Sequence, residues 1–140
     1  MTRPRLRLTS GSAFEHQIGY ARTVVDADWV FVSGCSGYDY ETMSLPDGVV
    51  PQAEQAMRNV ESALRGAGAS ITDVVRVRYF LPDRADFPAC WPVLRHWFAA
   101  SPPAATMIVC GLLEAEMRIE IEVTARMTPR DPRRGERCET

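Results

Sequence analysis

The sequence has no lysine and no excess of positive charge. Its 16 basic residues, all arginine, are outnumbered by 18 acidic residues, which gives a net charge of −2. A protein dedicated to DNA or RNA carries a basic patch or stripe instead. The charge balance therefore argues against a nucleic-acid partner.

The chain also lacks a long apolar run. No stretch approaches the ~20 apolar residues that a membrane-spanning helix needs. Residues 1–10, MTRPRLRLTS, lack the hydrophobic core of a secretion signal. We therefore expect a cytoplasmic protein with no membrane partner.

Closely spaced metal ligands are missing as well. The four cysteines are Cys35, Cys90, Cys110 and Cys138, and the two histidines are His16 and His96. Zinc sites are usually recognised in a sequence by closely spaced ligand pairs such as CxxC, and no such pair occurs here. The sequence predicts no metal and free thiols.

What is present describes one ordinary domain. A chain of 140 residues, 46% of them hydrophobic, is long enough to bury a core without disulfides. We predict a single domain over residues 1–127. Residues 128–140 are polar, contain proline and have no periodicity, so they are predicted to form a disordered tail.

Hydrophobic patterning predicts the elements. Strands are expected at 5–8, 20–25, 29–33, 74–81, 105–112 and 118–127, helices at 51–67 and 86–99, and loops at 9–17 and 34–48. The first helix carries apolar residues at helical spacing from Ala53 to Ala67. In the strand 74–81, Val75 and Val77 are expected on the buried face, and Trp91 is expected in the buried stripe of the second helix.

The order of these elements predicts an α+β fold, in which one mixed sheet carries both helices on a single face. The other face would then carry alternating charges. They are Arg76, Arg78, Arg118, Glu120 and Glu122. Opposite charges can pair across neighbouring strands, and the same face could close against further copies of the chain.

Several short motifs then occur in a recognisable order. They are Tyr20, Val30-Phe31-Val32-Ser33-Gly34, Glu54-Gln55, Asn59, Ala67-Gly68-Ala69, Asp73-Val74-Val75-Arg76, Phe80-Leu81, Asp83, Pro103-Ala104 and Ile119-Glu120-Ile121-Glu122. In this order the sequence resembles the reactive-intermediate deaminase (Rid, or YjgF-like) superfamily over residues 19–127. No single motif is specific, but together they make a strong match.

The resemblance implies a chorismate-mutase-like fold, a homotrimer and a small-molecule cleft between neighbouring subunits. It also implies hydrolysis of reactive imines and enamines without a cofactor or metal. A protonated imine is already electrophilic, so such a site needs only to orient it and deliver water.

Carried over by position, the resemblance makes Glu120 the carboxylate that activates water. It makes Tyr20 an aromatic that closes the cleft, and Ser33 and Gly34 the backbone turn at the ligand, with Cys35 beside them. Each residue also has a structural alternative. Glu120 could pair with an arginine across the sheet, Tyr20 could be a packing residue, and Gly34 could merely end a strand.

The sequence departs from the deaminases at a second set of positions. Ala105 stands where they carry an arginine that clamps the substrate carboxylate. Met107 and Trp91 replace smaller or more polar residues, although both could instead belong to the core. Arg118 is the first candidate for a substitute clamp and Arg22 the second. We therefore expect poor activity on small α-imino acids and a preference for neutral or larger apolar substrates.

Two other functions stay open at this stage. The chain could be a non-catalytic small-molecule-binding or regulatory trimer of the same fold. Ribonuclease or translation-inhibitor activity is a label often attached to this superfamily, but the charge balance argues against it.

Overall fold

A computed structural model of the protein describes residues 4–128, and the predicted tail lies, from residue 129 on, outside them. The strands are β1 (Leu6–Leu8), β2 (Thr23–Asp26), β3 (Trp29–Ser36), β4 (Val74–Leu81), β5 (Ala104–Val109) and β6 (Glu120–Arg126). The helices are α1 (Ala13–Ile18), α2 (Val49–Gly66) and α3 (Phe87–Phe98), with single 3₁₀ turns at Ile71–Asp73 and Arg84–Asp86.

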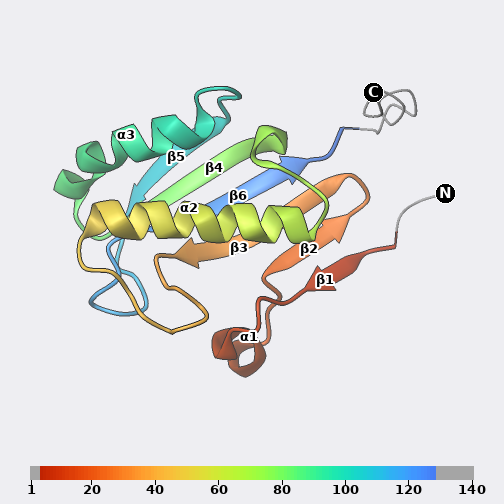
Figure 1. Ribbon diagram of the computed structural model, residues 1–140, viewed down its shortest axis with the longest axis horizontal. Coiled ribbons are helices and arrows are strands. Elements are labelled where there is room, and N and C mark those ends of the chain that lie inside the picture. Colours follow the sequence, from red (N-terminus) through yellow and green to blue (C-terminus); the bar gives the residue numbers. More distant parts are fainter. Residues whose placement is uncertain (1–3, 129–140) are drawn as a thin grey trace, which may run out of the picture.

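The strands form one mixed sheet in the order β1-β2-β3-β6-β4-β5. Only the β4–β5 pair is parallel, and the other neighbours are antiparallel. Figure 1 shows α2 and α3 lying across the same face of this sheet. The predicted architecture is confirmed, and the last strand, β6, lies in the middle of the sheet.

The core lies between α2 and the sheet. The predicted apolar face of α2 is completely buried at Ala53, Ala56, Met57, Val60 and Leu64. It packs against inward-facing side chains of the central strands, which include Val32, Val77, Ile121 and Val123. None of the helices in the described part of the chain is long and apolar enough to cross a membrane.

A short helix, α1, replaces most of the loop predicted at 9–17. The Ser12 hydroxyl accepts a hydrogen bond from the Phe14 N–H at 3.3 Å, and Gly19 ends the helix with a left-handed φ of 91°. Six residues are too few to show helical periodicity, so only these capping residues marked the helix in the sequence.

Two side chains predicted to be buried are exposed. Val75 is 45% exposed because the β4–β6 register shifts between Val74 and Arg76, and Val74 takes the inward position. Trp91 is 54% exposed, since α3 turns Cys90 toward the core in its place.

The face of the sheet away from the helices carries the predicted charged residues except Arg118. Arg78 on β4 pairs with Glu122 on β6, with Nε 3.7 Å from Oε1, as cross-strand pairing predicts. The strand predicted at 118–127 begins only at Glu120, so Arg118 does not belong to it.

Candidate functional site

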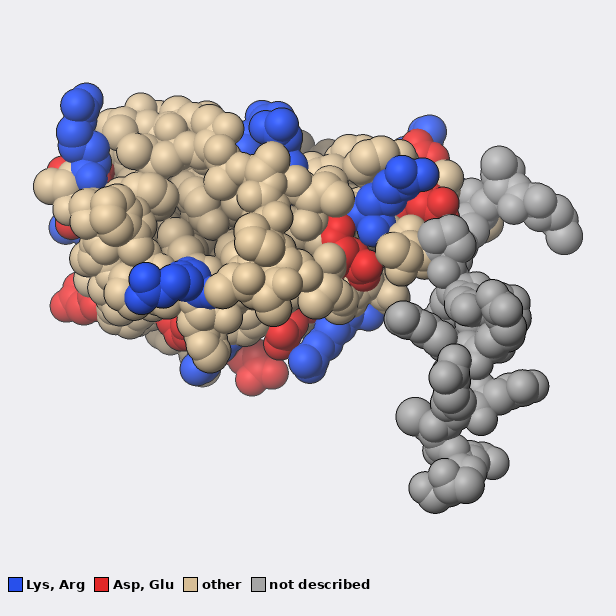
Figure 2. Space-filling model, turned by 90° about the horizontal axis from the view of Figure 1, so that it is seen from above, with Lys and Arg blue, Asp and Glu red and all other residues tan. Residues whose placement is uncertain are grey.

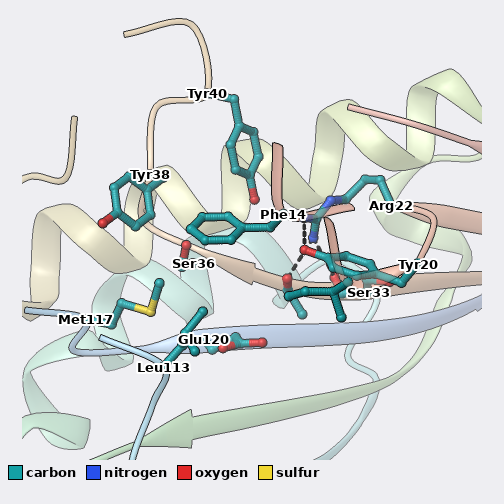
Figure 3. A pocket seen from close by; sticks show the side chains of 12 residues that line it. Phe14, Tyr20, Arg22, Ser33, Ser36, Tyr38, Tyr40, Leu113, Met117 and Glu120 are labelled. Carbon is teal, nitrogen blue, oxygen red and sulfur yellow. Dashed lines mark hydrogen bonds between the residues drawn. The ribbon is translucent and has the colours of Figure 1, made fainter. Parts of the chain in front are cut away.

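A cavity of about 320 Å³ opens beside the start of β6, within the size range of small-molecule sites. Five residues that the sequence analysis singled out line it, namely Tyr20, Ser33, Gly34, Glu120 and the candidate clamp Arg22. The remaining lining residues are Phe14, Ile18, Ser36, Tyr38, Tyr40, Leu113 and Met117. Figure 3 shows Phe14, Tyr38 and Tyr40 on one side of the cavity and Leu113 and Glu120 on the other.

Glu120 lies against the backbone of β3. A Cβ built on Gly34 would lie 1.9 Å from Glu120 Oε1, a distance no real side chain allows. The β3–β6 register shifts between Val32 and Cys35, so Ser33 and Gly34 form an irregular turn inside the strand. Gly34 therefore does not end a strand, because β3 continues to Ser36; it leaves room for the carboxylate.

The environment of Glu120 favours its neutral form. Burial raises the pKa of this carboxyl group, Arg22 opposes that rise, and Glu122 adds to it. Arg78, a predicted alternative partner, pairs with Glu122 instead. Within residues 4–128 no hydrogen bond or ion pair holds the Glu120 carboxylate, so it is available to accept a proton.

Arg22 holds the turn on which Glu120 rests. Its side chain is 5% exposed, and Nη1 donates hydrogen bonds to the carbonyl oxygens of Gly34 at 2.6 Å and Ser33 at 3.3 Å. The guanidinium group also lies 5.7 Å from the ring centre of Tyr20 and 5.4 Å from that of Tyr40. The turn and the two rings are thus fixed by one buried cation.

A buried carboxylate, Glu15, balances this cation. Glu15 is 5% exposed, and its Oε2 lies 3.9 Å from Arg22 Nε. Burial alone would raise the pKa of Glu15, but hydrogen bonds from the Ser10 hydroxyl and backbone N–H outweigh it and hold the pKa below its ordinary value. Glu15 is therefore ionised at neutral pH and compensates the charge of Arg22.

The aromatic wall comes from the loop after β3. Asn59 on α2 anchors this loop by donating hydrogen bonds to the carbonyl oxygens of Ser36 at 3.0 Å and Tyr38 at 2.8 Å. The Tyr38 hydroxyl donates to Glu114 in the β5–β6 loop, and this bond raises the pKa of Tyr38 to about 12. The two loops that flank the cavity are therefore joined to each other.

Sequence reasoning missed the apolar part of the cavity. Phe14 and Ile18 come from α1, and Leu113 and Met117 come from the β5–β6 loop. The helix caps at Ser12 and Gly19 were the signal that could have found the first pair. The loop residues have no such signal, because their positions depend on the path of the loop into the start of β6.

The other predicted site residues lie elsewhere. Trp91 on α3 and Met107 on β5 are 54% and 38% exposed, so neither is a core residue. Ala105 lies in a shallow groove between β5 and α3, and none of these three residues lines the cavity of its own chain. Arg118 does not line it either; its side chain is exposed and its backbone N–H donates to Gln52 Oε1 at 2.7 Å.

Cys35 lies behind the cavity and not in it. The side chain is completely buried, and its Sγ is 3.6 Å from Arg22 Nη1. Burial raises the pKa of the Cys35 thiol to about 11, so the thiol is protonated at neutral pH. Cys35, which the sequence places beside the ligand turn, therefore does not line the cavity of this chain.

The described residues offer neither a metal-binding cluster nor, on the face that Figure 2 shows, a basic patch. Within residues 4–128 no three His, Cys, Asp or Glu side chains gather in a way that could hold a metal ion. On the face seen in Figure 2, arginines are separated from one another and interspersed with acidic side chains.

Comparison with known proteins gives consistent matches over most of the chain. The model of a family described as "Endoribonuclease L-PSP" matches residues 10–127. A curated fruit fly (Drosophila melanogaster) protein, "RutC family protein UK114", is 33% identical over 86% of this chain and 88% of its own length. A goat (Capra hircus) protein named "2-iminobutanoate/2-iminopropanoate deaminase" is 34% identical over 79% of this chain and 81% of its own.

A solved structure matches equally well. The crystal structure of a Mycobacterium tuberculosis member of the YjgF/YER057c/UK114 family superposes with a TM-score of 0.82 at 31% identity. The match covers 89% of this chain and 100% of that one.

Proposed function

Because this chain belongs to the endoribonuclease L-PSP family, which includes the YjgF-like and reactive-intermediate deaminase proteins, we propose that it hydrolyses a small reactive imine or enamine. The products are a carbonyl compound and ammonia. One observation carries the proposal: Glu120, a carboxyl group with a raised pKa and no hydrogen-bond or ion-pair partner within residues 4–128, faces a cavity of small-molecule size. The name of the goat relative supports the same chemistry.

The proposed mechanism uses the two protonation states of Glu120. The carboxylate accepts a proton from water as the water oxygen bonds to the imine carbon, which gives a carbinolamine. The carboxylic acid then returns the proton to the nitrogen. As the C–N bond breaks and ammonia leaves, the hydroxyl group passes its proton to the Glu120 carboxylate or to solvent and becomes the carbonyl oxygen. A pKa raised by burial suits a group that must act first as base and then as acid. We propose that no metal or cofactor takes part.

We propose further that the chain assembles as a homotrimer and that a neighbouring subunit completes each cavity. The surface of α3 and β5 is the candidate covering surface, because its apolar side chains Trp91, Met107 and Val109 are exposed. Ala105 lies on the same side and would join the site only in this way. Light scattering should give about three times the chain mass of 15.6 kDa, and a clean monomer would contradict the assembly.

Two other functions compete with this one. A trimer that only binds a small molecule would keep the cavity without the chemistry. A ribonuclease would fit the name of the family, but the net charge of −2 and the dispersed arginines on the face in Figure 2 give RNA little to bind.

The deciding experiment measures how fast an imine, generated in situ by an amino-acid or amine oxidase, disappears. We expect acceleration over the protein-free rate with the wild type and a loss of roughly 100-fold or more with Glu120→Gln. Glu61→Gln is the matched control, because Glu61 pairs with Arg65 on α2 outside the cavity. If the wild-type and Glu120→Gln proteins both bound the imine tightly but neither accelerated its hydrolysis, the non-catalytic alternative would be favoured.

A further inference from the structure

Few charged side chains face the cavity, and they differ in whether another residue compensates their charge. Among the lining residues that the described part of this chain contributes, only Arg22 and Glu120 carry a formal charge. Most of the Arg22 guanidinium group is already engaged. Nη1 bonds to two backbone carbonyl oxygens, and Nη2 donates to the Tyr20 hydroxyl at 3.5 Å. Nε is buried without a hydrogen-bond partner among the described residues, and it forms an ion pair with Glu15 Oε2 at 3.9 Å.

The net charge that this chain presents to the cavity is negative. With Arg22 compensated by Glu15, the uncompensated charge in the cavity is that of Glu120, and Glu114 adds another carboxylate behind Tyr38. A substrate carboxylate bound here would lie close to Glu120 in a partly desolvated space, where like charges repel strongly. A protonated imine would instead be attracted to Glu120.

The mouth of the cavity is apolar. Ile18 and Leu113 line it although they are 65% and 68% exposed, the two highest values among the large apolar residues of the described chain. Phe14 and Met117 extend the same apolar surface inward. A ligand that covered these side chains would remove them from water and gain the hydrophobic contribution.

From this charge balance and this apolar mouth we propose that the cavity selects a protonated imine with an apolar or aromatic substituent and no carboxylate group. The inference rests on the proposed imine hydrolysis and adds the substrate class. The substituent lies against Ile18 and Leu113, and the cationic C=N group lies toward Glu120.

The reaction balances without a further reactant. R₂C=NH₂⁺ and water give R₂C=O and NH₄⁺. A C=O bond replaces the C=N bond, and both protons of water move by way of Glu120 or solvent to the nitrogen, which leaves as ammonium. No oxidant or reductant is needed by the hydrolysis itself.

The test uses a pair of substrates that differ only in the carboxylate. An amine oxidase converts 2-phenylethylamine to its imine, and an amino-acid oxidase converts phenylalanine to the corresponding imino acid. We expect kcat/KM to be at least tenfold higher for the imine without the carboxylate. A kcat/KM for the imino acid that equals or exceeds the kcat/KM for the imine would overturn the substrate class while leaving imine hydrolysis intact.

Binding keeps the inference testable if neither imine is hydrolysed. Calorimetry would compare 2-phenylethylamine, a stable cation, with phenylacetate, an anion of similar size. Tighter binding of the amine would support the selectivity even though the proposed hydrolysis had failed, and tighter binding of phenylacetate would refute it.

A side-chain test addresses the apolar mouth. Leu113→Ser should lower kcat/KM for the 2-phenylethylamine imine roughly tenfold, because the substituent loses an apolar contact. Val50→Ser is the control, since Val50 is 40% exposed at the start of α2 and does not line the cavity. Equal effects of the two substitutions would show that the substituent does not lie at the mouth.

Discussion

The carboxylate of Glu120 occupies the space where a side chain of residue 34 would begin. A Cβ on Gly34 would lie 1.9 Å from Oε1, and the Gly34 carbonyl oxygen is held from the other side by Arg22 at 2.6 Å. The position of the carboxylate therefore depends on a residue without a side chain and on a buried cation that fixes that residue. Tight packing of this kind leaves little freedom for the reacting group.

Gly34→Ala tests this contact directly. The added methyl group must displace the carboxylate of Glu120, and a misplacement of about 1 Å can cost roughly 100-fold in rate. We expect kcat/KM to fall by about that factor. Gly66→Ala is the control, because a Cβ there meets nothing within 4 Å. An active Gly34→Ala protein would show that Glu120 does not react from this position.

The pH dependence of activity follows from the raised pKa of Glu120. The carboxylate is the form that accepts a proton from water, so activity should rise as pH increases through that pKa. The midpoint of this rise in kcat/KM should lie above the ordinary glutamate value of about 4.3. A midpoint at or below that value would contradict the environment described for Glu120.

Glu120→Gln should also stabilise the fold in a pH-dependent way. Below about pH 4 the carboxyl group is protonated in both the folded and the unfolded chain, so it adds no penalty. As pH rises through the raised folded pKa, ionisation costs more in the fold than in the unfolded chain, and stability is lost. The melting temperature of Glu120→Gln should therefore exceed that of the wild type at pH 8 and approach it near pH 4. A lower melting temperature at pH 8 would contradict this sign.

Arg22→Ala should be strongly destabilising. It leaves the buried Glu15 carboxylate without its cation, and breaking a buried pair costs about 3–5 kcal/mol. Urea unfolding would measure the loss. Arg58→Ala removes an exposed pair with Glu54 on α2 and should cost less than about 1 kcal/mol. Similar losses in the two variants would mean that Arg22 and Glu15 do not act as a buried pair.

Ala105→Arg tests whether a neighbouring subunit completes the cavity. In the trimer the new guanidinium would supply the missing carboxylate clamp, so activity on 2-iminopropanoate-type substrates should rise about tenfold or more. Ala104→Arg is the matched control, because the adjacent residue points to the opposite face of β5. No gain from Ala105→Arg in a protein that light scattering shows to be trimeric would place Ala105 outside the site.

The sequence predicted the sheet and its two long helices well, because those elements carry long periodic patterns. The apolar positions from Ala53 to Leu64 on α2 and the alternation from Ile121 to Ala125 on β6 each match the observed burial. Periodicity did not predict which side chains are buried where a one-residue shift changes the pairing register of two strands. The shift between Val74 and Arg76 turned Val75 outward, and no local pattern in the sequence marks that shift.

Only the site residues that the resemblance supplied could be predicted, because the others are brought together by tertiary structure. Tyr20, Ser33, Gly34 and Glu120 lie together because the resemblance carried their relative positions. The pairing of Arg22 with Glu15 depends on where α1 lies, and the sequence of a six-residue helix gives no periodic pattern from which that position could be predicted. Trp91 and Met107 have ordinary core residue types, and only the three-dimensional arrangement shows that they are exposed.

The central position of β6 has a consequence for the order of folding. The strand that is synthesised last separates β3 from β4, so the sheet consists of two halves until β6 is inserted between them. Pairing β3 with β6 closes a very long loop of chain, which is an entropically slow step. Glu120 is the first residue of that strand and Gly34 lies on its partner, so the cavity is absent from any intermediate that lacks β6. Recovery of ligand binding during refolding should therefore coincide with completion of the sheet and not with formation of either helix.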